Sequence, residues 1–431
     1  MKLLLKNARV VDPASGIDGA HDVLVEDGRI ARVAKRVEAA GATTLDLAGL
    51  CVCPGFIDMH VHLREPGQEW KETIATGTRA AAAGGFTGVA CMPNTQPPID
   101  SRSVVEFVLA QARQHGAVPV YPIGCVSKGQ AGLELAEMGD MAVAGARGFS
   151  DDGKPVASAG LMRRALEYSR IFDLAVIDHC EEPTLVSGGV VHEGEVSTRL
   201  GLSGWPGVAE DVMVQRDILL AEYTGGAVHI AHLSTGRAAD LVRRAKETKI
   251  RVTCEVTPHH VALTHEAVAG YDTHAKMNPP LRAESDRQAL LAAIADGTVD
   301  AIATDHAPHN ADEKCVEFSR APFGVVGLET AVSICLDRLV HGGVIGLPRM
   351  VELLAVGPAS ILRLKKGSLR EGDDADITVL DLERRCVVEP GAFESKSVNT
   401  PFGGWTLRGG PVMTIVGGRI VHDVRERTGE R

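Results

Sequence analysis

Long apolar runs are missing from this sequence. No stretch of about 18 consecutive apolar residues occurs, so we expect no membrane-spanning segment. The first residues, from Met1 to Lys6, are interrupted by charge and predict a strand rather than a signal peptide. Aromatic residues are also scarce, at 4% of 431 residues, whereas the apolar fraction of 45% is ordinary. This composition is typical of a soluble protein rich in Ala, Val and Gly.

An excess of positive charge is likewise absent. The chain has 45 Lys and Arg against 56 Asp and Glu, which gives a formal net charge of -11. Binding to a nucleic-acid backbone needs a basic face, so we expect no nucleic-acid partner. We also expect no membrane partner.

The nine cysteines lack the even number and the spacing of a disulfide framework. Scattered cysteines suit reduced thiols, so we expect a cytoplasmic protein. Cys51 and Cys53 could share a metal ion, but no second pair completes a structural zinc site. We expect both to be buried as small apolar side chains.

The two ends of the chain carry similar strand signals. Residues 23–30 contain an Asp-Gly hairpin signal between apolar runs, and residues 375–380 and 412–420 repeat the strand pattern near the C-terminus. We therefore predict one small β-sandwich domain built from residues 1–53 and 366–431. Independent caps at each end are the alternative.

The middle of the chain, residues 54–365, alternates short β-rich runs with helical stretches, as parallel βα units do. The eight predicted strands are 55–62, 86–92, 118–126, 146–152, 174–180, 228–233, 252–257 and 301–305. The predicted helices include 72–83, 103–115, 160–170, 208–223, 237–248 and 286–295. Eight such units favour an α/β fold of the (β/α)8 TIM-barrel type. An open doubly wound sheet is the alternative, but no Gly-rich dinucleotide turn follows the first strand.

Metal-type side chains stand at the ends of most predicted strands. In a (β/α)8 barrel these ends share one face, where the active site lies. His60 and His62 sit at i and i+2 in an extended segment, so both imidazoles lie on one side of it. The other strand-end residues are Asn94, Asp151, Asp152, His179, His232, His259, His260, Asp305, His306 and His309. Four histidines and two carboxylates suit one or two zinc-like ions, which would activate water and polarise an amide-like carbonyl.

Several motifs resemble the amidohydrolase superfamily and, within it, the dihydroorotases of the long bacterial type. The motifs are residues 54–64 (PGFIDMHVHLR), 92–95 (MPNT), 149–153 (FSDDG), 276–282 (KMNPPLR), 303–309 (ATDHAPH), 321–324 (APFG) and 327–330 (GLET). The resemblance covers essentially the whole chain. It implies reversible cyclisation of N-carbamoyl-L-aspartate to L-dihydroorotate with loss of water, a step of pyrimidine (UMP) biosynthesis.

The same resemblance implies roles for individual residues. His60 and His62 would bind the more buried Zn²⁺ and His179 and His232 a second one. Asp305 would be both a metal ligand and the general acid/base. Arg64, Asn94, His309 and Asn278 would bind the substrate, and the planar fork of Arg64 suits a carboxylate. The resemblance further implies a homo-oligomer and, as in some relatives, a complex with aspartate transcarbamoylase.

One position departs from the wider superfamily. Many members bridge their metals with a carboxylated lysine at the end of strand 4, whereas residues 146–152 contain no lysine. Asp152 is the best match to that position and could bridge two divalent ions, with Lys154 as the less favoured alternative. After strand 8, the polar loop 310–320 could be a lid over the substrate or a solvated connection.

Two other functions compete with this one. A related cyclic amidase (a hydantoinase, dihydropyrimidinase or allantoinase) would act on a neutral ring, which needs no carboxylate clamp of the Arg64 and Asn94 kind. A catalytically silent scaffold for aspartate transcarbamoylase would be expected to lose metal ligands, yet every expected ligand is present.

Overall fold

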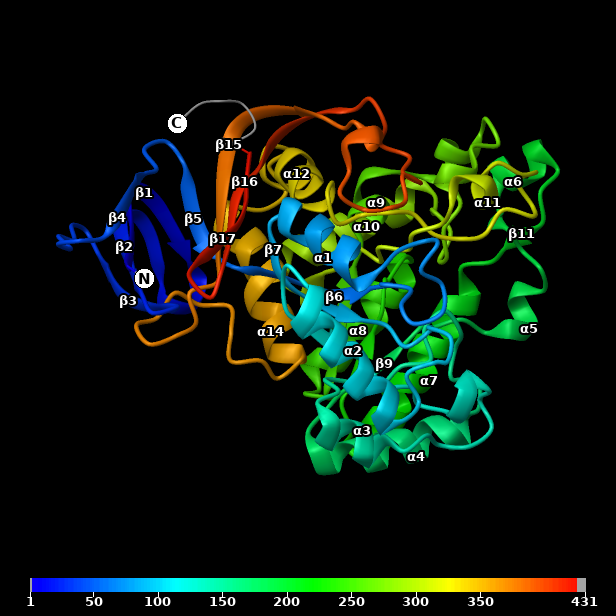
Figure 1. Cartoon of the computed structure of the whole chain (residues 1–431). Helices are drawn as coiled ribbons and strands as arrows, with labels where there is room; N and C mark the ends of the chain where they lie inside the picture. Colours follow the sequence, from blue (N-terminus) through cyan, green and yellow to red (C-terminus); the bar gives the residue numbers. More distant parts are fainter. Residues whose placement is uncertain (1, 425–431) are drawn as a thin grey trace.

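The computed structural model describes residues 2–424. Figure 1 shows strands of both chain ends side by side at one end of the molecule and the helix-rich middle of the chain beside them. Within the described residues, no helix is long and apolar enough to cross a membrane.

One sheet joins the two ends of the chain. Its main path runs β17-β16-β15-β5-β1-β2-β3, and β4 pairs with β1. The strands are β1 (Lys2–Asp12), β2 (Ile17–Glu26), β3 (Arg29–Ala34), β4 (Thr43–Asp46), β5 (Cys51–Pro54), β15 (Ile377–Val387), β16 (Thr406–Val416) and β17 (Arg419–Asp423). The connection between the two ends is antiparallel pairing of β5 with β15, with Pro54 opposite Ile377.

Tight turns explain two of these hairpins. Asp27 and Gly28, between β2 and β3, both have positive φ angles, as do Gly417 and Gly418 between β16 and β17. Two consecutive residues with positive φ make the turn that matches the twist of antiparallel strands. The hairpin predicted from Asp27-Gly28 is confirmed.

The middle of the chain contains parallel strands in two small sheets. One has the order β6-β7-β8 and the other β14-β13-β12-β9. Their strands are β6 (Phe56–Val61), β7 (Phe86–Cys91), β8 (Val120–Pro122), β9 (Val176–Asp178), β12 (Val228–Ile230), β13 (Val252–Val256) and β14 (Ala301–Ile302). Single parallel bridges extend both edges. They join Val61 to His306, and Phe149 to both Gly124 and Val176.

The fourth predicted strand differs from the prediction. In residues 146–152 only Phe149 forms bridges, and the segment is otherwise irregular. The remaining seven predicted strands each contain an observed strand, although every observed strand is shorter. After this single bridge residue the chain leaves the sheet and enters the loop that carries Asp151 and Asp152.

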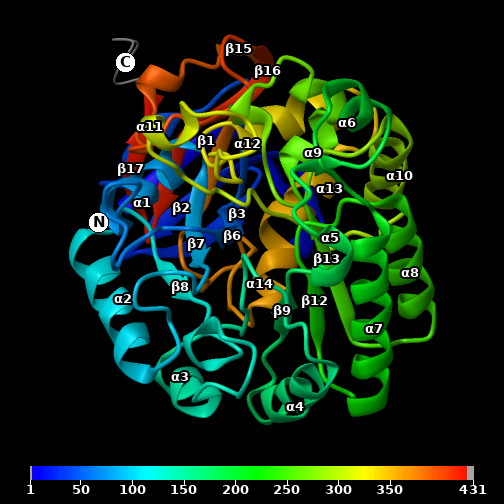
Figure 2. The same cartoon turned by 90° about the vertical axis from the view of Figure 1, so that its right-hand side faces the viewer.

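Helices surround the inner strands. In Figure 2, α2, α3, α4, α7 and α8 lie outside the strands β6 to β9, β12 and β13. The helices are α1 (Ile74–Ala83), α2 (Arg102–His115), α3 (Met138–Ala144), α4 (Ala159–Ser169), α5 (Pro183–Val186), α6 (Glu195–Leu200), α7 (Val208–Thr224), α8 (Gly236–Glu247), α9 (Pro258–Ala262), α10 (Glu284–Ala295), α11 (Ala311–Lys314), α12 (Ala331–Ile334), α13 (Leu347–Val351) and α14 (Gly357–Ile361). The small pair β10 (Val191–His192) and β11 (Gly204–Trp205) lies outside this arrangement, near α5 and α6.

The helices begin where the sequence supplies caps. Thr73, Ser158 and Thr235 each accept a hydrogen bond from a backbone N–H in the first turn of α1, α4 and α8. Such caps satisfy N–H groups that have no partner within the helix. They fix the helix starts close to the predicted positions.

Candidate metal centre

A cavity of about 340 Å³ opens at the carboxyl ends of the inner strands. It brings together nine of the ten predicted site residues, namely His62, Arg64, Asn94, Asp152, His179, His232, Asn278, Asp305 and His309. The tenth, His60, is fully buried beside them. The rest of the lining comes from Gly153, Ala307, Pro322, Phe323 and Gly324.

Asp152 lies at the centre of the histidine cluster. Its Oδ1 atom is 3.4 Å from Nε2 of His60, 3.4 Å from Nε2 of His232 and 3.5 Å from Nδ1 of His179. Its Oδ2 atom is 3.5 Å from Nε2 of His62. One carboxylate therefore faces all four imidazoles, as a bridging ligand would.

Asp305 closes the other side of the cluster. Its Oδ1 atom lies 3.0 Å from Nε2 of His62 and 3.6 Å from Nε2 of His60. Two groups have ligand atoms close enough to share an ion, His60 with His62 and Asp305, and His60 with Asp152 and His232. His179 belongs to neither group, although its Nδ1 atom is 2.9 Å from Nε2 of His232.

Two observations fit a divalent cation at this position. Nε2 of His60 and Oδ1 of Asp152 are buried without a hydrogen-bond partner, which is costly unless something else contacts them. His232, Asp305 and Arg64 have φ angles of 31°, 48° and 63°, a strained region for residues with side chains. Imidazole and carboxylate donors in this number suit zinc.

The charges of the cluster point the same way. Burial acts to raise the pKa of Asp152, but His60, His179 and His232 outweigh it and hold that pKa well below its usual range. Burial lowers the pKa of His179, but Asp152 and Glu181 outweigh it and raise it to about 10. Without a metal ion, protonated imidazoles supply the positive charge that keeps the buried carboxylates ionised. A divalent ion could replace those protons, because metal binding displaces them from its ligands.

Three of the four histidines have a second ring nitrogen held by another side chain. Nδ1 of His60 bonds to Glu255 at 2.7 Å, Nδ1 of His62 to Asn94 at 2.8 Å, and Nε2 of His179 to Glu181 at 2.9 Å. Such partners orient the ring and fix which nitrogen faces a metal. Neither Glu255 nor Glu181 was predicted from the sequence. A single acidic residue inside the apolar strand 252–257 was the signal for Glu255.

Arg64 is a buried cation without an acidic partner among the described residues. Its side chain donates from Nε to the carbonyl of Pro308 at 3.2 Å, and its guanidinium lies 3.5 Å from Nε2 of His309. The other buried arginine, Arg282, lies 3.4 Å from Glu210. Burial lowers the pKa of Arg64 to about 10, so it remains charged at neutral pH. This side of the cavity therefore offers a free charge to an anion.

Asn278 also lines the cavity, and its side chain bonds to Glu181. Nδ2 of Asn278 donates to Glu181 at 3.0 Å, while its Oδ1 atom is buried without a partner. Asn278 can therefore still accept a hydrogen bond from a ligand N–H.

Buried side chains of loop 310–320 hydrogen-bond to neighbouring segments of the protein. Most of its residues are exposed, but Lys314 and Phe318 are buried. Lys314 donates to the carbonyls of Thr273, Lys276 and Pro322 at 2.8 to 3.3 Å. Lys276 in turn donates to Phe318 and Ser319 and lies over the ring of Phe323. The loop is not a merely solvated connection.

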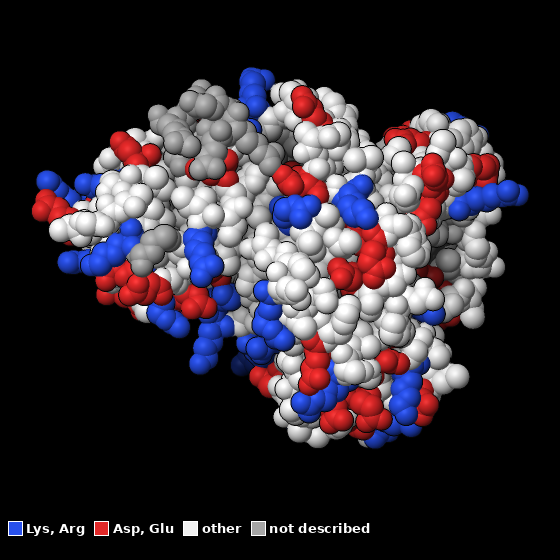
Figure 3. All heavy atoms as spheres, viewed as in Figure 1, with Lys and Arg blue, Asp and Glu red and all other residues white. Residues whose placement is uncertain are grey.

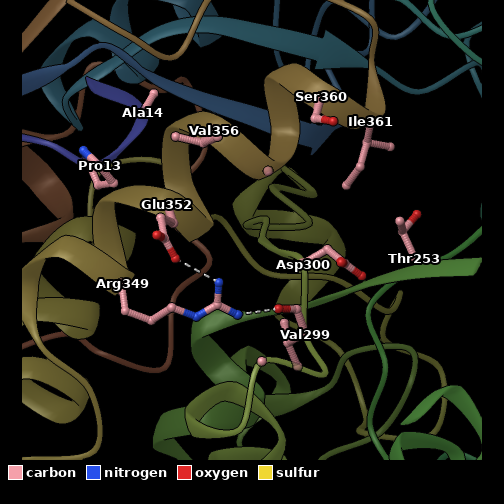
Figure 4. Close-up of a pocket in the computed structure, with 12 residues that line it drawn as sticks. Pro13, Ala14, Thr253, Val299, Asp300, Arg349, Glu352, Val356, Ser360 and Ile361 are labelled. Atoms are coloured by element: carbon pink, nitrogen blue, oxygen red, sulfur yellow. Dashed lines mark hydrogen bonds and ion pairs between the residues drawn. The ribbon is translucent and has the colours of Figure 1, made fainter. Parts of the chain in front are cut away.

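A second cavity, of about 280 Å³, lies near the amino ends of β13 and β14 (Figure 4). Its charged side chains pair with other groups. Arg349 bonds to Glu352 at 3.1 Å and to the carbonyl of Val299 at 2.6 Å, and Asp300 bonds to Lys246 at 2.6 Å. With these charges already paired, it lacks the free ligand atoms of the first cavity.

Several other residues lie outside the cluster. Lys154 is exposed and bonds to the carbonyl of Gln130, and Cys51 and Cys53 are buried in β5 as expected. His260 bonds to Thr257 and to the carbonyl of Pro279.

A further acidic cluster, Asp178 with Cys180 and Asp217, already has a cation in Arg216, which pairs with both carboxylates.

The face in Figure 3 carries acidic and basic side chains interspersed rather than gathered by sign. A nucleic-acid footprint would be a basic patch. Among the described residues, this face shows no such patch.

Comparison with known proteins gives consistent matches. A family model described as Dihydro-orotase-like matches residues 49–238. The chain is 56% identical to a dihydroorotase of Pelotomaculum thermopropionicum and 54% identical to one of Anaeromyxobacter dehalogenans, in each case over 98% of both chains. Among solved structures it is similar to the L-hydantoinase (dihydropyrimidinase) of Arthrobacter aurescens, at 26% identity and a TM-score of 0.89 over 98% of this chain and 96% of that one. The dihydropyrimidinase of Brevibacillus agri, at 21% identity and a TM-score of 0.86 over 98% and 95%, shares the fold.

Proposed function

The chain belongs to the dihydroorotase family, and from this premise we propose how its residues convert N-carbamoyl-L-aspartate to L-dihydroorotate and water, reversibly, at the centre described above. The substrate is a small molecule, and the chemistry is that of a cyclic amidohydrolase.

The observation that carries the assignment of substrate class is the buried guanidinium of Arg64. A buried charge without a counter-ion is costly. A substrate carboxylate would remove that cost, because it matches the guanidinium fork. His309 and Asn94 line the same cavity and would be the further contacts to this carboxylate, and Oδ1 of Asn278 would accept a substrate N–H.

We propose one or two Zn²⁺ ions as the cofactor. His60, His62 and Asp305 would hold the more buried ion, His179 and His232 the other, with Asp152 shared between them. When bound, the metal lowers the pKa of a water molecule and polarises the reacting carbonyl. The assignment rests on the donor set and on the two buried ligand atoms without partners.

Asp305 is proposed as the general acid and base. Burial raises its pKa, but His62 and His60 outweigh burial and the pKa is lowered, so the carboxylate is ready to accept a proton. In the hydrolytic direction it takes the proton of the attacking water and passes it to the departing ring nitrogen. In the cyclising direction the same carboxylate works in reverse.

A hydantoinase or dihydropyrimidinase activity is the second candidate, and the solved structures with similar folds carry those names. Arg64 argues against it, because a neutral ring leaves the buried guanidinium without a counter-ion. Hydrolysis of hydantoin together with failure to hydrolyse dihydroorotate would reverse the choice.

The test combines metal analysis with activity. Purified protein should contain zinc and hydrolyse L-dihydroorotate, and both should be measured with and without aspartate transcarbamoylase. Activity only in the mixture would mean that the complex is the working enzyme. Protein that binds no zinc and stays inactive even in the mixture would support the scaffold hypothesis.

We also propose the wider architecture. The bridges at Phe149 and His306 extend the edges of both inner sheets, and we infer that they close them into a (β/α)8 barrel over residues 54–365. Residues 1–53 and 366–431 would form the second, sandwich-like domain. The free thiols favour the cytoplasm. The homo-oligomer stays a prediction, as does the transcarbamoylase complex that the mixed assay tests.

A further inference from the structure

Glu255 is an acidic residue inside β13 whose side chain contacts the histidine cluster at His60. Its side chain is fully buried. It contacts Nδ1 of His60 at 2.7 Å, Nε2 of His229 at 3.2 Å and the backbone N–H of His232 at 3.3 Å. None of the sequence motifs includes Glu255 or His229.

The directions of these hydrogen bonds follow from chemistry. An ionised carboxylate only accepts, so both imidazoles donate an N–H to Glu255. A metal-binding His60 is neutral, and with its proton on Nδ1 its lone pair is on Nε2, the atom that faces Asp152 and Asp305.

The chain of contacts continues away from the centre. Nδ1 of His229 lies 2.8 Å from the hydroxyl of Thr253, and because Nε2 carries the proton, Nδ1 accepts from that hydroxyl. Thr253 borders the second cavity, as Figure 4 shows. His229 and Thr253 are paired across β12 and β13, so the strand register sets their spacing.

We infer that Glu255, oriented by His229 and Thr253, is a positioning residue that holds the His60 ring with Nε2 toward the metal. The inference deepens the proposed function and rests on its metal centre. Glu255 itself touches no substrate-cavity surface, since it is absent from the lining.

Glu255 differs from the partners of the other rings. Glu181 and Asn94 are only half-buried; Asn94 lines the cavity, and Glu181 bonds to Asn278, which also lines it. Glu255 is fully buried in β13, so the orientation of the His60 ring is set before any ligand binds. Its bond to the His232 N–H also supports a backbone position with strained φ.

The test measures zinc affinity in the full-length chain by competition with a chelator. Glu255→Gln keeps the shape but presents an NH2 group to one of the two imidazoles, so one ring loses its acceptor. His229→Gln removes the second imidazole that contacts Glu255, and Thr253→Val removes only the hydroxyl that donates to His229. Asp22→Asn is the matched control, since Asp22 is a buried carboxylate that accepts two backbone N–H groups far from the centre.

We expect Glu255→Gln to weaken binding of the tighter zinc ion by about 10- to 100-fold, the usual effect of losing a partner of a metal-bound histidine. The loss should be smaller for His229→Gln and smallest for Thr253→Val, and Asp22→Asn should bind zinc as the wild type does. With zinc saturating, kcat should fall in Glu255→Gln while KM stays near the wild-type value.

Wild-type affinity in a folded Glu255→Gln chain overturns the inference. A loss in Thr253→Val as large as that in Glu255→Gln does so too, because it would indicate general loosening of the strands. If Glu255→Gln does not fold, His229→Gln decides, and wild-type affinity there is the refuting result. A wild type that binds no zinc overturns the proposed metal centre as well, whereas a zinc-binding wild type beside an unaffected Glu255→Gln refutes the positioning role alone.

Discussion

Replacing Arg64 by methionine should weaken substrate binding far more than it disturbs the fold. Methionine fills a similar volume without the charge. In the free protein the guanidinium has one hydrogen bond to a carbonyl and no acidic partner among the described residues. The fold therefore loses little when the charge is removed, and the melting temperature should stay close to that of the wild type.

The expected loss is in the complex. Hydrogen bonds to a charged group are worth about 1.5–3 kcal/mol each. A bidentate contact to the substrate carboxylate, less the cost of taking it out of water, leaves about 2–4 kcal/mol. At about 1.4 kcal/mol per tenfold change, KM should rise roughly 30- to 1,000-fold.

Steady-state hydrolysis of L-dihydroorotate by zinc-loaded protein measures this effect. Arg64→Lys is the control, because it keeps the charge but not the planar fork, and its KM should fall between the other two. Zinc content should be the same in all three proteins. An unchanged KM in Arg64→Met would refute the carboxylate clamp, and so would a large drop in zinc content that accounts for the lost activity.

Three further outcomes follow from the structure. Asp305→Asn should lower kcat by about 10²- to 10⁴-fold through loss of proton transfer; retention of near-normal turnover in the folded, zinc-loaded variant would remove Asp305 from the mechanism. Removing metal with a chelator should abolish activity and lower the melting temperature, and zinc should restore both, because a ligand that binds only the folded state stabilises it; a chelator-treated protein that keeps both its activity and its melting temperature would contradict the metal centre. Burial lowers the pKa of Lys314 to about 7 and that of Lys276 to about 8. From about pH 7 up to the ordinary lysine pKa, the unfolded chain therefore binds more protons than the folded one. The free energy of unfolding should rise with pH across that window. Urea unfolding at pH 7 and pH 9 should show a smaller rise in Lys314→Met, and equal rises in both proteins would contradict the role of this buried amine.

The ligand positions could be predicted because strand ends converge by geometry. A barrel-type order of elements requires the carboxyl ends of parallel strands to share one face, so His60, His179 and His232 could be assigned to one site from the sequence. The tight turn at Asp27-Gly28 was equally readable, since few residues tolerate two positive φ angles.

The buried residues that support the site and its loop could not be predicted in the same way. Glu255 acts through His60, 195 residues away in the chain, and no local pattern reports such a contact. Lys314 lies in a polar segment that suggested either a lid or a solvated loop. Its burial depends on carbonyl groups of residues 273 and 276, which come close only in the folded chain.

The pairing of β5 with β15 has a consequence for how the protein is made. Pro54 and Ile377 face each other across the sheet, so after Pro54 the ribosome must add 323 residues, up to and including Ile377, before the two can pair. At ribosomal speeds of about 5–20 residues per second, β5 waits roughly 16 to 65 seconds for β15. During this interval the edge of β5 is an open template for other nascent chains. We therefore expect this edge of the growing chain to need protection until β15 emerges.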